Sequence, residues 1–311
     1  MLAILLALAS ALGYGGSDFA AGLASREASV IRVTFVAEAA SVLLMLLVVP
    51  WVSTGTPSTA SVAWAVAAGI GGIGGAMALY LGFRHAAFSV AAPLSAVATA
   101  AFSVLAGLLF GEHPGGLALA GIALALPAIV AVSATPGSPA STEASTEAPA
   151  STEVPASTEV PACTGAPARS GRQLAGGLYG LVAGAGFGVL FIGLNRAGSG
   201  SDLWPAVIAQ LAGLAFVCVL GAARGQLRLP HRRAGWLAVV TGVTGAGGTL
   251  CYFVATHAGL LAVTAVITSL YPASTILLAR LLLGERITKI RVAGLGLAAA
   301  SVALIAIAGS G

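Results

Sequence analysis

The chain has 311 residues, of which 58% are hydrophobic and only 8% are charged, with a formal net charge of +4. A soluble domain carries charge on about 25% of its residues, so a water-facing surface for a chain of this length is excluded. Apolar runs of about 20 residues, each long enough to cross about 30 Å of hydrocarbon, predict an all-α polytopic membrane protein. A transmembrane β-barrel is excluded because the alternating apolar and polar segments of barrel strands are missing.

Five apolar spans fill the first part of the chain. We expect transmembrane helices at about 2–24, 30–52, 62–81, 87–110 and 116–133. Residues 134–171 then repeat Ala-Ser-Thr-Glu-Val-Pro with little variation and contain no aromatic residue. Such a segment cannot bury a core, so we predict a disordered linker.

Five more apolar spans follow the linker, at about 173–194, 203–223, 234–256, 260–283 and 290–308. The sequence Leu282-Leu283-Gly284-Glu285-Arg286 repeats Leu109-Phe110-Gly111-Glu112-His113, 173 positions later. Gly121 and Gly294 follow their Glu at the same distance. A helix, a Gly-Glu corner and a second helix, written twice, indicate a duplicated chain, which divides into a first repeat (1–133), the linker (134–171) and a second repeat (172–311).

Other positions of the two repeats correspond as well. The matches are Gly13, Gly15 and Gly22 with Gly184, Gly186 and Gly193; Glu38 with Gln210; and Trp64, Gly75, Tyr80 and His85 with Trp236, Gly247, Tyr252 and His257. Because each half has an odd number of spans and the linker is too polar to cross the bilayer, the halves must be inverted relative to each other. Inverted repeats are typical of secondary transporters, in which the substrate site lies near the midplane between the halves.

The basic residues predict the orientation, because cytoplasmic loops carry an excess of Lys and Arg. On the linker side are Arg26, Arg32, Arg84, Arg169, Arg172, Arg224, Arg228, Arg232, Arg233, Arg286, Lys289 and Arg291. The opposite side has only Arg196. We therefore predict a cytoplasmic linker and two external termini, in a plasma-membrane protein.

The chain resembles the ten-helix members of the drug/metabolite transporter superfamily, which are built from two EamA domains. The resemblance is carried by Tyr271-Pro272, Gly284-Glu285 and Gly294, and by Tyr14-Gly15, Arg32, Gly111, Glu112 and Gly121; Thr99 stands where the first half would have its Pro. It implies transport of amino acids, other metabolites or drugs, often with proton coupling. It also implies cytoplasmic termini, which conflicts with the charge distribution; we keep the charge-based prediction.

Two acidic residues, Asp18 and Glu38, are the only ones expected inside spans. An ionisable group at that depth usually faces a cavity or a partner. Each is a candidate proton or cation site, and the alternative is a structural one: hydrogen bonding of neutral Glu38 to a neighbouring helix, and pairing or interfacial exposure for Asp18. The Gln210 counterpart of Glu38 is a further cavity candidate, and it slightly favours the structural alternative.

Aromatic rings suit organic substrates with one polar end, so we expect a cavity lined by Tyr14, Phe35, Tyr80, Tyr252 and Tyr271. Glu112 and Glu285 stand at helix ends, where a carboxylate can accept N–H bonds from the next helix, and we assign them structural roles. Pro93 and Pro272 can interrupt their spans and free carbonyl groups toward the cavity. The sequence predicts no metal site, no cofactor and no nucleic-acid partner.

The leading functional hypothesis is a secondary active transporter, an exporter of a small organic metabolite working by alternating access with possible proton coupling. The alternative is a membrane scaffold or lipid-binding protein that transports nothing. An intramembrane enzyme is disfavoured because the chain lacks His-Glu-x-x-His and similar catalytic patterns. The chain could act as a monomer or as a homodimer.

Overall fold

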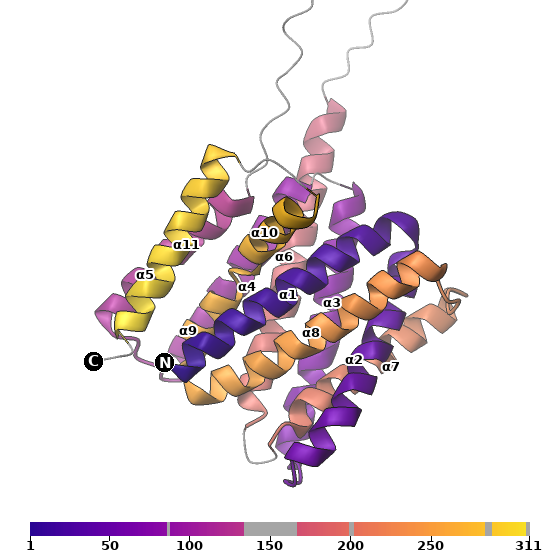
Figure 1. Cartoon of the computed structure of the whole chain (residues 1–311), viewed down its shortest axis with the longest axis horizontal. Helices are drawn as coiled ribbons and strands as arrows, with labels where there is room; N and C mark the ends of the chain where they lie inside the picture. Colours follow the sequence, from indigo (N-terminus) through magenta and orange to yellow (C-terminus); the bar gives the residue numbers. More distant parts are fainter. Residues whose placement is uncertain (86–87, 134–166, 199–201, 284–287, 309–311) are drawn as a thin grey trace, which may run out of the picture.

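The computed structural model describes residues 1–85, 88–133, 167–198, 202–283 and 288–308, and these are helical or lie in short connections (Figure 1). Residues 134–166 of the expected linker (134–171) and Glu285 lie outside the described residues. The helices are α1 (Leu2–Glu27), α2 (Val30–Val52), α3 (Thr59–His85), α4 (Phe88–Leu109), α5 (Gly116–Ser133), α6 (Pro167–Arg196), α7 (Trp204–Ala223), α8 (Arg232–Ala258), α9 (Leu261–Thr268), α10 (Tyr271–Leu283) and α11 (Lys289–Ala308).

These helices are apolar on their outer as well as their inner faces. Leu43 and Leu47 of α2 are each 61% exposed, and Leu281 of α10 is 77% exposed. A helix that shows large apolar side chains to its surroundings is typical of a membrane span. Eight helical segments are long and apolar enough to cross a bilayer, with α9 and α10 counted together, and α4 and α5 supply two shorter apolar helices.

The two halves of the chain pack as inverted repeats, as predicted. Their main contacts come in matched pairs: α1 lies on α8 as α6 lies on α3, and α2 lies on α8 as α7 lies on α3. The helices α5 and α11, which close the two repeats, lie against each other. Figure 1 shows α1 and α6, the first helices of each half, running in opposite directions.

Glycines let the two repeats approach closely, and they reveal the register of the duplication. A Cβ on Gly13 would lie 2.8 Å from the Cα of Gly248, and one on Gly186 would lie 2.7 Å from the Cα of Gly75. Gly13 and Gly186 are 173 positions apart, as are Gly75 and Gly248. The structure therefore shifts the sequence alignment by two residues in α1 and α6, and by one residue in α3 and α8.

The ninth expected span is two helices. α9 ends at Thr268 and α10 begins at Tyr271, with Ser269 and Leu270 in a turn between them. Pro272 has no N–H and cannot bond the carbonyl group of Thr268, which explains why the break falls there. The interruption expected at Pro272 is therefore observed, whereas α4 continues through Pro93 and the break expected there is not.

The sixth span also begins earlier than expected. α6 starts at Pro167, inside the segment assigned to the linker. Proline is favoured at the first position of a helix because that N–H has no helical partner. The α6 helix therefore begins six residues before the expected span, nearly two turns of helix.

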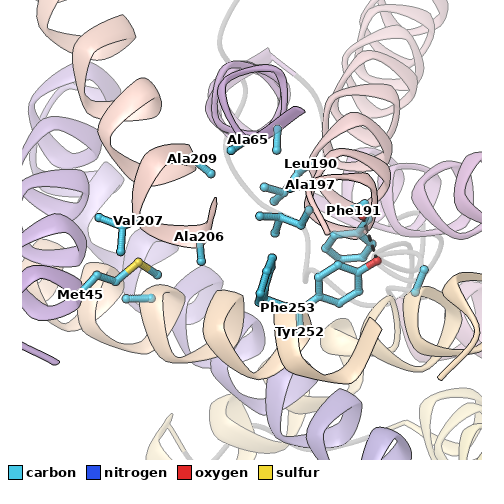
Figure 2. Packing of buried hydrophobic residues seen from close by; sticks show 14 of the residues in the cluster. Met45, Ala65, Leu190, Phe191, Ala197, Ala206, Val207, Ala209, Tyr252 and Phe253 are labelled. Carbon is cyan, nitrogen blue, oxygen red and sulfur yellow. Dashed lines mark hydrogen bonds between the residues drawn. The ribbon is translucent and has the colours of Figure 1, made fainter. Parts of the chain in front are cut away.

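The largest apolar cluster fills the end of the molecule at which the termini lie. It joins the ends of α2, α6 and α8 to the starts of α3, α7 and α9, and its members include Met45, Ala65, Phe191, Val207, Tyr252 and Leu261. In Figure 2 the rings of Phe191 and Tyr252 lie against each other, with centroids 4.2 Å apart. Apolar side chains therefore close the end of the molecule at which the termini lie.

Candidate functional site

A cavity of about 110 Å³ lies between the two repeats, on the linker side of this cluster. Residues of α1 to α4 line it together with residues of α6, α7, α8 and α10. A volume of this size has room for several water molecules. The cavity is therefore a shared feature of both halves, as the inverted repeat predicted.

Equivalent faces of α1 and α6 form two of its walls. α1 contributes Tyr14, Ser17 and Asp18. α6 contributes Phe187, Leu190 and Phe191, which lie 173 positions later, the offset set by the glycine contacts. The duplicated positions have thus diverged into a polar wall and an apolar wall.

Glu38 lies in the middle of α2 and lines the cavity with Thr34 and Ser41. Its Oε2 is enclosed and has no hydrogen-bond partner among the described residues. A Cβ on Gly213 of α7 would lie 3.3 Å from this oxygen, so the glycine leaves room for the carboxyl group. Thr34 and Ser41 donate to the carbonyl groups of Val30 and Gly242.

Asp18 lines the same cavity from α1. No described residue forms a hydrogen bond or an ion pair with it. The described lining contains no Lys, Arg or His. Among the described lining residues, two carboxyl groups therefore have no basic side chain to balance them.

The aromatic candidates divide into two groups. Tyr14, Tyr80 and Tyr271 line the cavity, and Gln210 of α7 does so as well. The hydroxyl groups of Tyr14 and Thr249 lie 3.0 Å apart in a hydrogen bond. Tyr271 is 5% exposed, and its hydroxyl is enclosed beside the Ser95 side chain of α4.

Tyr252 and Phe35 are not among the cavity-lining residues. Tyr252 is fully buried, stacks on Phe191 and donates its hydroxyl to the Phe191 carbonyl group at 3.3 Å. The one-residue shift in α3 and α8 explains this, because one residue turns a side chain by about 100° around a helix. Phe35 is half-buried on α2, away from the stripe of Val33, Ala37 and Ser41 that faces the cavity.

Glu112 accepts two backbone N–H bonds, but from a helix other than the one expected. Its Oε1 lies 2.6 Å from the Leu261 nitrogen, and its Oε2 lies 2.9 Å from the Ala262 nitrogen. These are N–H groups of the first turn of α9, which have no partner within their own helix. Glu112 therefore caps a helix of the other repeat rather than the neighbouring α5.

Small polar side chains of the lining were missed by the sequence reasoning: Ser17, Thr34, Ser41, Thr99, Thr241 and Thr249. A signal for some of them was present. Thr34, Glu38 and Ser41 recur at the spacing of one helix face, as do Tyr14, Ser17 and Asp18. Thr99 was noted only as a departure from a proline pattern.

Potential metal ligands do not gather in the described residues: no group of three or more His, Cys, Asp and Glu side chains is found there. Cys218 and Cys251 are free thiols in apolar helices.

Comparison with known proteins agrees with this architecture. A family model described as the EamA-like transporter family matches residues 1–134 and 174–307. A solved structure titled "Crystal structure of protein" superposes with a TM-score of 0.72, covers 98% of each chain and is 15% identical in sequence, which shows a shared fold. No curated protein sequence matches the chain.

Proposed function

Since the chain belongs to the EamA-like transporter family, we propose that it is a secondary active transporter that exports a small organic metabolite by alternating access. Family membership implies membrane transport and separates the chain from enzymes. The substrate, amino-acid-like or drug-like, the outward direction and the mechanism are our proposal.

The cavity between the repeats is the observation that supports it. Binding sites of inverted-repeat transporters lie at the interface of the two halves, near the midplane. Here each half contributes matched helices to one cavity, and apolar packing closes one of its two ends. Such an arrangement can open to one side of a membrane at a time.

We further propose that proton movement through Asp18 or Glu38 drives the transport. A carboxyl group at this depth is stable when neutral, and it can carry a proton between the two openings of the cavity. Asp18 and Glu38 are the acidic residues among those lining the cavity, so carboxylate coupling must use one or both of them.

The test is flux into proteoliposomes of a metabolite selected by comparing overproducing with deletion cells. We expect an imposed pH gradient to drive flux in the wild type, and Glu38→Gln or Asp18→Asn to abolish that drive. Glu27→Gln, which changes a carboxyl group outside the cavity lining, should leave it intact. If the flux of both cavity variants depended on pH as that of the wild type does, carboxylate coupling would be rejected. If the wild type showed no substrate-dependent flux, the scaffold alternative would be favoured.

A further inference from the structure

The two repeats give the cavity an acidic side and a neutral side. Asp18 and Glu38 come from the first repeat, on α1 and α2. The equivalent helices of the second repeat contribute Phe191 and Gln210 instead. The cavity is therefore polarised across the pseudo-symmetry axis that relates the halves.

This polarity limits what can occupy the cavity. A buried carboxylate without a partner is strongly unfavourable, and an anionic ligand would add like-charge repulsion. Asp18 and Glu38 both line the cavity, and neither forms a hydrogen bond or an ion pair with a described residue. Two carboxyl groups on one cavity, without a described partner, suit a ligand that donates hydrogen bonds and carries positive charge.

The opposite wall requires an apolar ligand body. Phe187, Leu190 and Phe191 offer carbon surface and no charge. The ring of Tyr14 lies 6.0 Å from that of Phe191, so an aromatic face lies beside the acidic wall. Ammonium groups are attracted to aromatic faces as well as to carboxylates.

Building on the proposed function, we propose that the substrate is a small organic cation, an ammonium group on an apolar or aromatic body. The ammonium group lies between Asp18 and Glu38 and donates to their carboxylate oxygens. The body lies against Phe187, Leu190 and Phe191 on α6. Asp18 and Glu38 thus select ligands with positive charge, and the apolar side chains of α6 select ligands with a hydrophobic body.

The test is calorimetric binding to the purified full-length protein, using four probes at one pH. Phenylethylamine has both features, 3-phenylpropionate reverses the charge, 3-phenylpropanol removes it, and methylamine lacks the body. We expect phenylethylamine to bind at least about tenfold more tightly than each of the others, which is a difference of about 1.4 kcal/mol in binding free energy. The double variant Asp18→Asn/Glu38→Gln should lose that preference.

The chain offers a matched rescue and a matched control. Moving the carboxyl group across the cavity, in Glu38→Gln/Gln210→Glu, should preserve the preference for phenylethylamine. Glu27→Gln should bind as the wild type does, and a thermal melting curve reports whether each variant is folded. Equal or tighter binding of 3-phenylpropionate, unchanged selectivity in the folded double variant, or no binding of any probe by the wild type would overturn the proposal.

The same samples separate this inference from the proposed function. Phenylethylamine that binds selectively but shows no flux in proteoliposomes would contradict transport, while the cation site would stand. Flux of 3-phenylpropionate in preference to phenylethylamine would support transport and refute the cation site.

Discussion

Glu112 shows how one side chain can connect the two repeats. Its two carboxylate oxygens accept hydrogen bonds from two N–H groups of α9. This helix has only eight residues and therefore few backbone hydrogen bonds of its own. Hydrogen bonds to a charged acceptor are stronger than neutral ones, and the dipole of α9 adds to the attraction. The carboxylate therefore fixes both the start of α9 and the contact between the repeats.

We predict that Glu112→Gln lowers the free energy of unfolding by about 1–3 kcal/mol, because the amide nitrogen cannot accept and leaves one N–H unpaired. The measurement is the thermal midpoint in a fixed detergent. Glu27→Gln is the control, since its pairs with His231 and Arg233 lie at the surface and such pairs contribute at most about 1 kcal/mol. Equal midpoints for the two variants would contradict the assigned role.

At the scale of helices, glycines decide how closely the repeats pack. A Cβ on Gly69 of α3 would overlap the carbonyl oxygen of Ala209 on α7. Gly242 of α8 meets the Ala37 carbonyl group in the equivalent place. Because these contacts are with backbone atoms, a side chain cannot rotate away and the helices themselves must separate.

Gly69→Ala should therefore destabilise the protein by about 1–3 kcal/mol, the usual range for overpacking. Gly74 of the same helix is the matched control, since a Cβ there meets nothing within 4 Å. Gly74→Ala should be neutral or stabilising by up to about 1 kcal/mol, because alanine is the better helix former. Thermal midpoints of the two variants test this, and a Gly69→Ala variant as stable as Gly74→Ala would refute the packing argument.

The helices could be predicted from the sequence because each is an apolar run of membrane-spanning length, and the inversion followed from their number. The break at Ser269 and Leu270 was expected from Pro272, but the sequence did not distinguish it from Pro93, through which α4 continues without a break. Matching Tyr80 to Tyr252 predicted two equivalent cavity residues, but a shift of one position turns Tyr252 into the core. Asp18 and Glu38 were easier to identify because charge is rare in lipid, whereas serine and threonine are common there.

At the scale of the whole molecule, the side of the membrane toward which the cavity lies indicates the direction of transport. The apolar cluster and polar contacts between the repeats close the terminal end, where Asp202 accepts from the nitrogens of Thr54 and Gly55. The cavity lies between this closed end and the linker end. If the linker is cytoplasmic, as the basic residues predict, this state faces the cytoplasm and suits loading by an exporter.

This orientation is tested with Ala150→Cys and Ser310→Cys, each made in a Cys163→Ser background, and a membrane-impermeant maleimide. In intact cells we expect Ser310→Cys to react and Ala150→Cys to react only after permeabilisation, because the positive linker side remains in the cytoplasm. The background protein, whose Cys218 and Cys251 lie in apolar helices, should stay unlabelled. The opposite pattern would place the termini inside, as in the superfamily that the sequence resembles. The cavity would then face outward, and the same structure would represent the state from which an exporter releases its substrate.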